Sequence, residues 1–260
     1  MPRLPRPADA PDAVFHVTAR VNWRVFHLEP HVCVSAFYRV LRECLITFGV
    51  DLLAYVLMSN HFHLVTRSPP PKLFRKLTTR RTRCRHRRPW SRRHPNRWVR
   101  ARFMRHLLQR TSSAIQKELG ISGHLWEKSY HARRVLDATD LVATIAYDHL
   151  NPVEASMVLA PQEYDRSSAS WWDHGAASPV PLSGRLPPFD LTPAQLRAQL
   201  LSYQANRAFR DAMAEFEASG ARLGTWEGLE TLKAVLRNRG VLGSADTVVR
   251  TSGLEVKSRQ

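Results

Sequence analysis

The chain has 260 residues, of which 43% are hydrophobic and 23% charged, a balance typical of a globular protein. It contains no run of about 18 apolar residues, and its first residues lack the apolar segment of a secretory signal. These features argue against a membrane partner, and we expect a cytoplasmic location. The three cysteines, Cys33, Cys44 and Cys84, form no closely spaced pair, which favours reduced thiols over disulfides or a zinc cluster.

The formal net charge of +17 is concentrated in one region. No acidic residue occurs between Asp51 and Glu118, whereas 18 lysines and arginines do. A solvated basic segment would explain the charge alone, but Trp90, Trp98 and Phe103 are interleaved with the arginines. Cations that hold phosphates beside rings that stack on bases are typical of a surface for single-stranded nucleic acid. The side chains that we expect to bind DNA are Arg80, Arg81, Arg87, Arg88, Arg92, Arg93, Arg97 and Trp98.

Apolar periodicity predicts a strand-rich core in the first two thirds of the chain. Ser35 is predicted to cap a helix that Gly49 ends, and Thr139 to cap a helix that Asn151 and Pro152 end. The predicted strands are residues 13–21, 51–58, 61–67 and 131–136, and the predicted helices are 35–48, 104–119 and 140–150. This order predicts an α+β domain in which helices pack on an antiparallel sheet.

The remaining residues divide the chain further. Residues 72–100 are basic with little apolar periodicity, which predicts an insertion or mobile arm within a domain spanning residues 1–172. Residues 173–190 are rich in Pro, Gly, Ser and Ala and are predicted to be a linker. Helical patterns at 192–219 and 225–238 predict a helical C-terminal extension over residues 191–260.

His61 and His63 are the first candidate functional residues. They are two apart on a predicted strand, so both side chains point to one face, and Phe62 and Leu64 to the other. Two adjacent imidazoles can form half of a divalent metal site, although ordinary hydrogen bonds would explain such a pair equally well. A zinc hydrolase is a further reading, but no additional ligands follow the pair at short spacing.

The helix predicted at 140–150 carries the second group of candidates. At about 100° per residue, its apolar residues gather on one side and Tyr147 lies nearly opposite them, with Asn151 beside it. His149 projects into the apolar face, which indicates a structural role. A tyrosine in a helix usually serves packing, but this one shares its side of the helix with an amide and is better placed for chemistry.

Two segments, YVLMSNHFHLV at 55–65 and AYDHLNPV at 146–153, resemble the signature segments of single-tyrosine HUH transposases. Among these, the chain most resembles the REP-associated tyrosine transposases. Its segments FHVTAR at 15–20 and GHLWEKSY at 123–130 also resemble segments typical of that family, in the same order. The resemblance covers about residues 13–172, and residues 226–248 more weakly resemble the tail of longer members.

This resemblance implies a ferredoxin-like sheet and a set of site residues. It makes His61 and His63 ligands of Mg²⁺ or Mn²⁺, Asn151 a polar residue that completes the metal site, and Tyr147 the nucleophile. The implied reaction cleaves and rejoins hairpin-forming single-stranded DNA through a 5′-phosphotyrosine link, with no need for ATP. The implied partner is hairpin DNA of the REP-element type, in a bacterial, nucleoid-associated protein. A monomer and a homodimer are equally compatible with the sequence.

The sequence departs from the family pattern at Ser59, where proline is usual, and in the length and basicity of residues 72–100. Tyr130, which is flanked by basic residues, is a rival nucleophile, and Glu127 is either a further site residue or a surface charge. The alternative function is a catalytically inactive, domesticated DNA-binding protein that recognises structured repeats.

Overall fold

The structure is a computed structural model that describes residues 9–79, 98–127, 129–184, 186, 189 and 191–242. The sheet strands are β1 (Val14–Arg20), β2 (Asp51–Leu57), β3 (His61–Arg67) and β4 (His131–Val135). The helices are α1 (His31–Phe48), α2 (Pro71–Thr79), α3 (Trp98–Leu119), α4 (Ala138–Glu154), α5 (Ala169–His174), α6 (Pro193–Ala205), α7 (Arg207–Ala218) and α8 (Trp226–Asn238), with short 3-10 turns η1 (Asn22–Arg24) and η4 (Pro161–Glu163).

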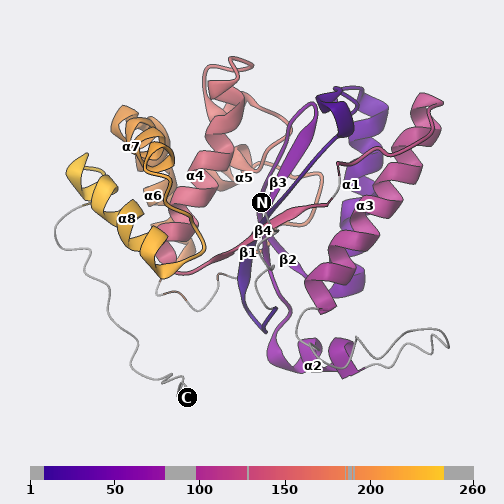
Figure 1. Ribbon diagram of the computed structural model, residues 1–260, viewed down its shortest axis with the longest axis horizontal. Helices are drawn as coiled ribbons and strands as arrows, with labels where there is room; N and C mark the ends of the chain where they lie inside the picture. Colours follow the sequence, from indigo (N-terminus) through magenta and orange to yellow (C-terminus); the bar gives the residue numbers. More distant parts are fainter. Residues whose placement is uncertain are drawn as a thin grey trace.

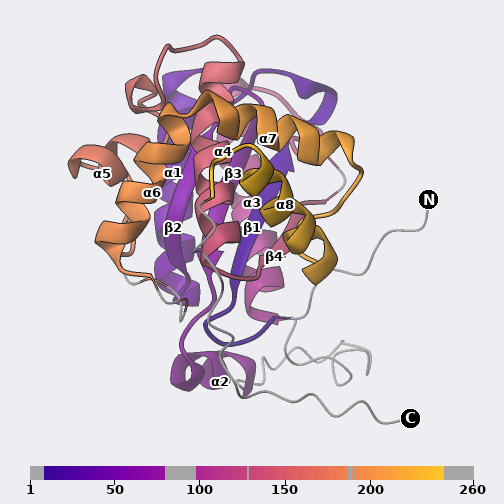
Figure 2. The same cartoon turned by 90° about the vertical axis from the view of Figure 1, so that its left-hand side faces the viewer.

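The four strands form one open antiparallel sheet in the order β2-β3-β1-β4, seen nearly edge-on in Figure 1 and face-on in Figure 2. Apart from the short helix α2 between β3 and α3, the chain passes through β1, α1, β2, β3, α3 and β4 in turn, and this connectivity with this strand order is the ferredoxin-like arrangement. The predicted α+β class, with helices packed on an antiparallel sheet, is therefore confirmed.

The two faces of the sheet are covered by different helices (Figure 1). On one face α1 and α3 pack over inward side chains such as Phe15, Val17, Phe62 and Leu64, all buried. On the other face α4 packs over β1, β2, β3 and β4. The alternation predicted for the third strand is confirmed: Phe62 and Leu64 face α1 and α3, and His63 faces α4.

Several helix ends differ from the predictions. Helix α1 begins at His31, after Pro30, and Ser35 lies inside its first turns; its predicted end at Gly49, in a left-handed conformation, is confirmed. Helix α4 is capped by Asp137, whose side chain accepts a hydrogen bond from the Asp140 amide, so the predicted cap at Thr139 is wrong. In each case a residue upstream of the expected cap takes that position.

Helix α4 also continues through Asn151 and Pro152, where the sequence predicts its end. Proline cannot donate the hydrogen bond that the carbonyl four residues earlier, that of Asp148, would receive. The side-chain amide of Asn151 donates to the Asp148 carbonyl instead (3.2 Å), and also to the Tyr147 carbonyl (3.0 Å). The helix therefore reaches Glu154 because the side chain of Asn151 replaces the missing backbone donor.

The basic segment is more ordered at its ends than its composition indicates. Helix α2 occupies Pro71–Thr79 and α3 starts at Trp98, so both ends of the 72–100 segment are helical, and the insertion or mobile arm stays a prediction. The predicted DNA-binding arginines Arg80, Arg81, Arg87, Arg88, Arg92, Arg93 and Arg97 lie outside the described residues.

The C-terminal helices α6, α7 and α8 lie on the side of α4 away from the sheet (Figures 1 and 2). Their buried residues join the apolar cluster under α4. The Lys233 ammonium of α8, almost fully buried, pairs with the Asp137 carboxylate at the start of α4 (2.7 Å). Helix α4 is thus enclosed from both sides. None of the helices in the described ranges is long and apolar enough to span a bilayer.

Candidate metal centre and tyrosine helix

Three polar side chains meet between the sheet and α4. His16 of β1 and His63 of β3 lie on the face that α4 covers, and Asp148 of α4 projects onto them. His16 Nε2 and His63 Nδ1 are 3.1 Å apart, and Asp148 Oδ1 lies 3.1 Å from the first and 3.0 Å from the second. The three atoms form a nearly equilateral triangle, which we call the His16–His63–Asp148 cluster.

The strand register explains why the histidines meet. In the β1–β3 ladder His63 is opposite Thr18, and His16 is opposite Val65. The two histidines are therefore diagonal neighbours on one face, a separation that long or aromatic side chains can bridge. Their rings are stacked, with centroids 5.3 Å apart.

The electrostatics of the cluster favour an anionic carboxylate at Asp148. Burial would raise the pKa of Asp148, but the neighbouring His16 and His63 outweigh it and hold that pKa well below its usual range. Burial lowers the pKa of His16, partly opposed by Asp148. Neither carboxylate oxygen of Asp148 accepts a well-aligned hydrogen bond from the described residues. A buried anion with unsatisfied oxygens facing two imidazoles is a costly arrangement unless something else binds it.

A divalent metal ion fits this donor set. Octahedral bonds of about 2.1 Å place adjacent ligand atoms roughly 3 Å apart, which matches the triangle. Deprotonated carboxylate and neutral imidazole are the protonation states that metal binding requires. Two imidazoles and one carboxylate suit a first-row transition ion such as Mn²⁺ better than Mg²⁺, which prefers oxygen ligands.

His61 lies at the edge of the cluster. Its ring is 5.1 Å from that of His63 between centroids, and its Nδ1 is 2.7 Å from Asn60 Oδ1. Burial first, and then the nearby His63 and Arg20, lower the pKa of His61 to about 4. The structure thus brings both sequence-predicted histidines to one site, with His63 at its centre and His61 beside it.

Tyr147, the predicted nucleophile, points toward the C-terminal extension. Its hydroxyl donates a hydrogen bond to Glu217 Oε1 of α7 (2.9 Å). Burial, and then this hydrogen bond, raise the pKa of Tyr147 above its ordinary value. The expectation that Tyr147 lies opposite the buried face needs correction, because α6, α7 and α8 cover that side and leave the tyrosine half-buried.

The other polar residues of α4 have structural partners. The Asn151 amide donates to backbone carbonyls of its own helix, as described above, and no contact with the histidines is seen among the described residues. His149 is fully buried between Ser168 Oγ (2.8 Å) and Gln204 Nε2 (3.0 Å), as predicted for a structural histidine. Asp140 and Thr144 bind Arg133 of β4.

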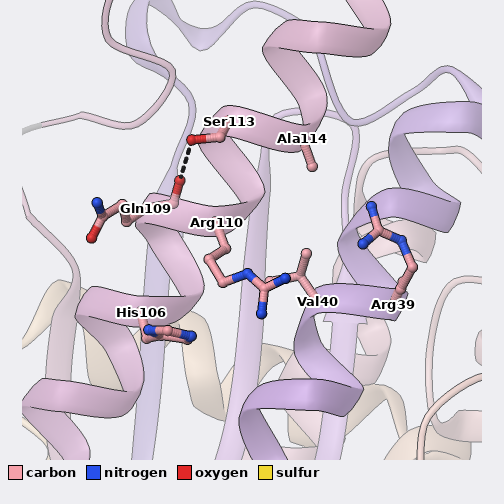
Figure 3. Close-up of a pocket in the computed structure, with 7 residues that line it drawn as sticks. All are labelled: Arg39, Val40, His106, Gln109, Arg110, Ser113 and Ala114. Carbon is pink, nitrogen blue, oxygen red and sulfur yellow. Dashed lines mark hydrogen bonds between the residues drawn. The ribbon is translucent and has the colours of Figure 1, made fainter.

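The remaining sequence candidates lie elsewhere. The side chain of Tyr130, the rival nucleophile, is buried in the cluster on the α1 and α3 side, and Glu127 is exposed. Trp98 starts α3, but its side chain is outside the described part. A pocket of about 460 Å³ opens between α1 and α3, lined by Arg39, His106 and Arg110 among others, in the layer across the sheet from the histidines (Figure 3).

Sequence reasoning missed His16, Asp148 and Glu217. Asp148 had a visible signal: it follows Ile145 by three residues and Leu141 by seven, so it is a carboxylate on the buried stripe of the helix. His16 shares its strand face with Val14 and Thr18, but its approach to His63 depends on which strands pair. Glu217 lies 70 residues from Tyr147, and no local pattern marks it.

Comparison of the sequence with protein families and with curated proteins finds no match. Comparison of the structure with solved structures finds several matches. One is a REP-associated tyrosine transposase bound to a REP hairpin, with a TM-score of 0.43 and 15% identity over 73% of this chain and 96% of its own. Another is a putative transposase from Deinococcus radiodurans R1, with a TM-score of 0.34 and 16% identity over 54% of this chain and 91% of its own. A third is tRNA(His) guanylyltransferase from Saccharomyces cerevisiae, with a TM-score of 0.36 and 9% identity over 94% of this chain and 85% of its own.

Proposed function

We propose that this chain is a metal-dependent single-tyrosine DNA transposase that cleaves and rejoins hairpin-forming single-stranded DNA, with Tyr147 as the nucleophile. One observation carries the proposal. Asp148, the residue directly after Tyr147, lies against His63, so the two segments with transposase-like sequence face each other across one site. Such a juxtaposition is expected if both segments serve the same reaction.

In the proposed reaction the Tyr147 oxygen attacks the scissile phosphorus in line. A phosphotyrosine bond to the 5′ side forms as the bond to the 3′ oxygen breaks, and the departing strand keeps a free 3′-OH. Attack by the 3′-OH of another strand reverses these steps and completes transfer. The tyrosine proton needs an acceptor because burial raises the pKa of Tyr147. Glu217, already hydrogen-bonded to that hydroxyl, is the acceptor that we propose.

For the metal we propose His63, His16 and Asp148 as ligands, with His61 beside them, and Mn²⁺ in preference to Mg²⁺. When bound, the ion supplies Lewis-acid stabilisation of the charge that develops on the phosphate. Asn151, which the family pattern places at the metal, is free for that role only if its side chain leaves the carbonyls of Tyr147 and Asp148. The arginines of residues 80–97 are proposed to bind the DNA backbone, which makes binding strongly salt-dependent.

A covalent-adduct assay tests the reaction. The protein is incubated with labelled hairpin oligonucleotides carrying single-stranded flanks, with Mn²⁺ or Mg²⁺, and resolved on a denaturing gel. The expected result is an adduct that Tyr147→Phe abolishes and Tyr130→Phe retains. Peptide mapping of the adduct should place it on Tyr147. Metal-dependent hydrolysis that persists in Tyr147→Phe would overturn the proposal.

A second candidate is the inactive DNA-binding protein, and one observation favours it. The Tyr147 hydroxyl and the Asn151 amide both bind groups other than the His16–His63–Asp148 cluster. This candidate predicts tight hairpin binding without an adduct in wild type, in Glu217→Gln and in Glu217→Ala, whichever metal is supplied.

A further inference from the structure

The loop that joins β1 to α1 carries exposed aromatic side chains close to the end of the sheet where His61 lies. We call the side chains of Trp23 and Phe26 the aromatic loop pair. Trp23 is 85% exposed and Phe26 is 58% exposed. Burying such large rings is strongly favourable, so a monomer gains nothing from leaving both in solvent. Two exposed rings three positions apart are better explained by a partner that covers them.

The backbone of this loop is held in an unfavourable conformation. Trp23 and Arg24 have φ values of 58° and 57°, in the left-handed region that bulky residues rarely adopt. Strain of this kind persists where the surroundings impose it, and it concentrates at functional sites. In this conformation the indole of Trp23 is exposed to solvent and does not pack on the core.

Hydrogen bonds tie the loop to the candidate site. Val21 N donates to the Asn60 carbonyl (2.7 Å), and Leu28 N donates to the Ser59 carbonyl (2.9 Å), so both ends of the loop are fixed to the turn before β3. The Asn60 side chain joins the two features: its Nδ2 donates to the Arg24 carbonyl (3.0 Å), and its Oδ1 lies 2.7 Å from His61 Nδ1. The aromatic loop pair is therefore held at a fixed position relative to His61.

Cations accompany the rings. Arg20, directly opposite His61 in the β1–β3 ladder, and Arg24 are both exposed. Exposed rings beside cations are the combination that binds single-stranded nucleic acid: every base has a face that stacks on a ring, and arginine holds the backbone. A purely apolar partner would not require these charges.

We propose that the aromatic loop pair is a stacking platform for unpaired bases that flank the scissile phosphate, with Arg20 and Arg24 holding the adjoining backbone. This inference rests on the proposed function, because it assumes that the strand to be cut passes His61. It assigns to Trp23 and Phe26 the grip on the single-stranded flank, separately from any recognition of the paired stem.

The test measures DNA binding by fluorescence anisotropy in a Tyr147→Phe background, which removes cleavage from the readout. The probes are a hairpin with a single-stranded flank, the same hairpin with a blunt end, and an unstructured oligo(dT). Trp23→Ala should weaken binding of the flanked hairpin and of oligo(dT) by roughly 5- to 150-fold, the effect of losing one stacked base. Blunt-hairpin binding should change little, and Trp23→Phe should restore most of the loss.

Trp226→Ala is the matched control, because Trp226 of α8 is also exposed (66%) but lies on the extension. It should leave all three affinities unchanged. Equal binding of flanked DNA by wild type and Trp23→Ala would overturn the inference, as would equal losses on blunt and flanked hairpins. A wild-type dimer that Trp23→Ala dissociates, with DNA affinity unchanged, would identify the pair as a self-association surface instead. Failure of the proposed function reads out separately, as the absence of any Tyr147 adduct.

Discussion

The two faces of the sheet are each covered by helices, yet different chemistry fills them. Under α1 and α3 the contacts are mainly between apolar side chains, with Phe62 packed against Phe37 and Trp126 at ring separations of 5.1 and 5.4 Å, and the Arg100 guanidinium lies over the Phe15 ring (3.9 Å). Under α4 the apolar contacts are interrupted by His16, His63 and Asp148. One strand, β3, supplies both faces with alternate residues.

This difference shows which face of the sheet carries an unfavourable contribution to folding stability. Apolar contacts on the face under α1 and α3 stabilise the folded state, whereas the α4 face holds a buried anion whose oxygens lack well-aligned donors. The protein can still fold because the face under α1 and α3, together with the apolar residues around α4, supplies the stability. The comparison predicts that substitutions on the first face act on stability, and those at the cluster act on metal binding.

The largest effect is expected from Phe62→Ala. Removing a fully buried ring that packs against two others should lower the free energy of unfolding by about 3–5 kcal/mol. Urea denaturation followed by circular dichroism measures it, with Phe62→Leu as a milder comparison. A loss of unfolding free energy below about 1 kcal/mol would contradict close packing on the face under α1 and α3.

Acid should destabilise the α4 side through His149. Burial lowers its pKa to about 4 in the folded protein, against about 6.5 in an unfolded chain. As the pH falls from about 6.5 to 4, the unfolded chain takes up a proton that the folded chain does not, so stability is lost, by up to about 3 kcal/mol from this group. In chelator-treated protein, His149→Gln should flatten the fall in unfolding free energy over this range. A slope identical to that of wild type would refute the assignment to His149. Part of the slope should remain in the variant, because the pKa of His61 is also lowered to about 4.

Metal should stabilise the protein through the cluster. At 100 times its dissociation constant, an ion that binds only the folded state adds about 2.7 kcal/mol. Thermal unfolding with and without MnCl₂ should show this increase in wild type and not in Asp148→Asn. Asp173→Asn, at a buried acid of α5 outside the cluster, is the matched control and should keep the increase. An equal Mn²⁺ effect in Asp148→Asn would remove Asp148 from the ligand set.

The smallest effect is expected on the outer surface of the α1 and α3 layer. Glu43 bridges Arg39 (3.8 Å) and Arg110 (2.5 Å), but all three side chains are exposed. Exposed ion pairs contribute little because water and salt screen them. Glu43→Gln should change the free energy of unfolding by less than about 1 kcal/mol, and a larger loss in urea denaturation would show that surface charge supports this layer as well.

The same contrast explains what sequence patterns predicted. Period-two alternation placed His61 and His63 on one face and Phe62 on the other, because strand geometry is local. Helix ends were less predictable: Asp137 and Asn151 act through side-chain hydrogen bonds that compete with the expected caps. Metal binding by His61, His63 and Asn151 stays a prediction, as does attack by Tyr147.

The parts of the site that patterns did not predict depend on long-range packing. His16 meets His63 across 47 positions, and Tyr147 meets Glu217 across 70. Such contacts follow from strand order and from the docking of the extension, and neither leaves a local signature in composition or spacing.

Three consecutive residues of α4 face three different neighbours: Tyr147 binds α7, Asp148 binds the histidines of the sheet, and His149 binds α6 and the residue before α5. A rotation of the helix about its axis would break these contacts together, so the three side chains oppose rolling of α4. A one-residue insertion or deletion before Tyr147 would turn the following residues by about 100° and bring a different side chain to each neighbour. The positions of these three residues around the helix axis are thus fixed by their contacts, a constraint that neither hydrophobicity nor helix propensity would reveal.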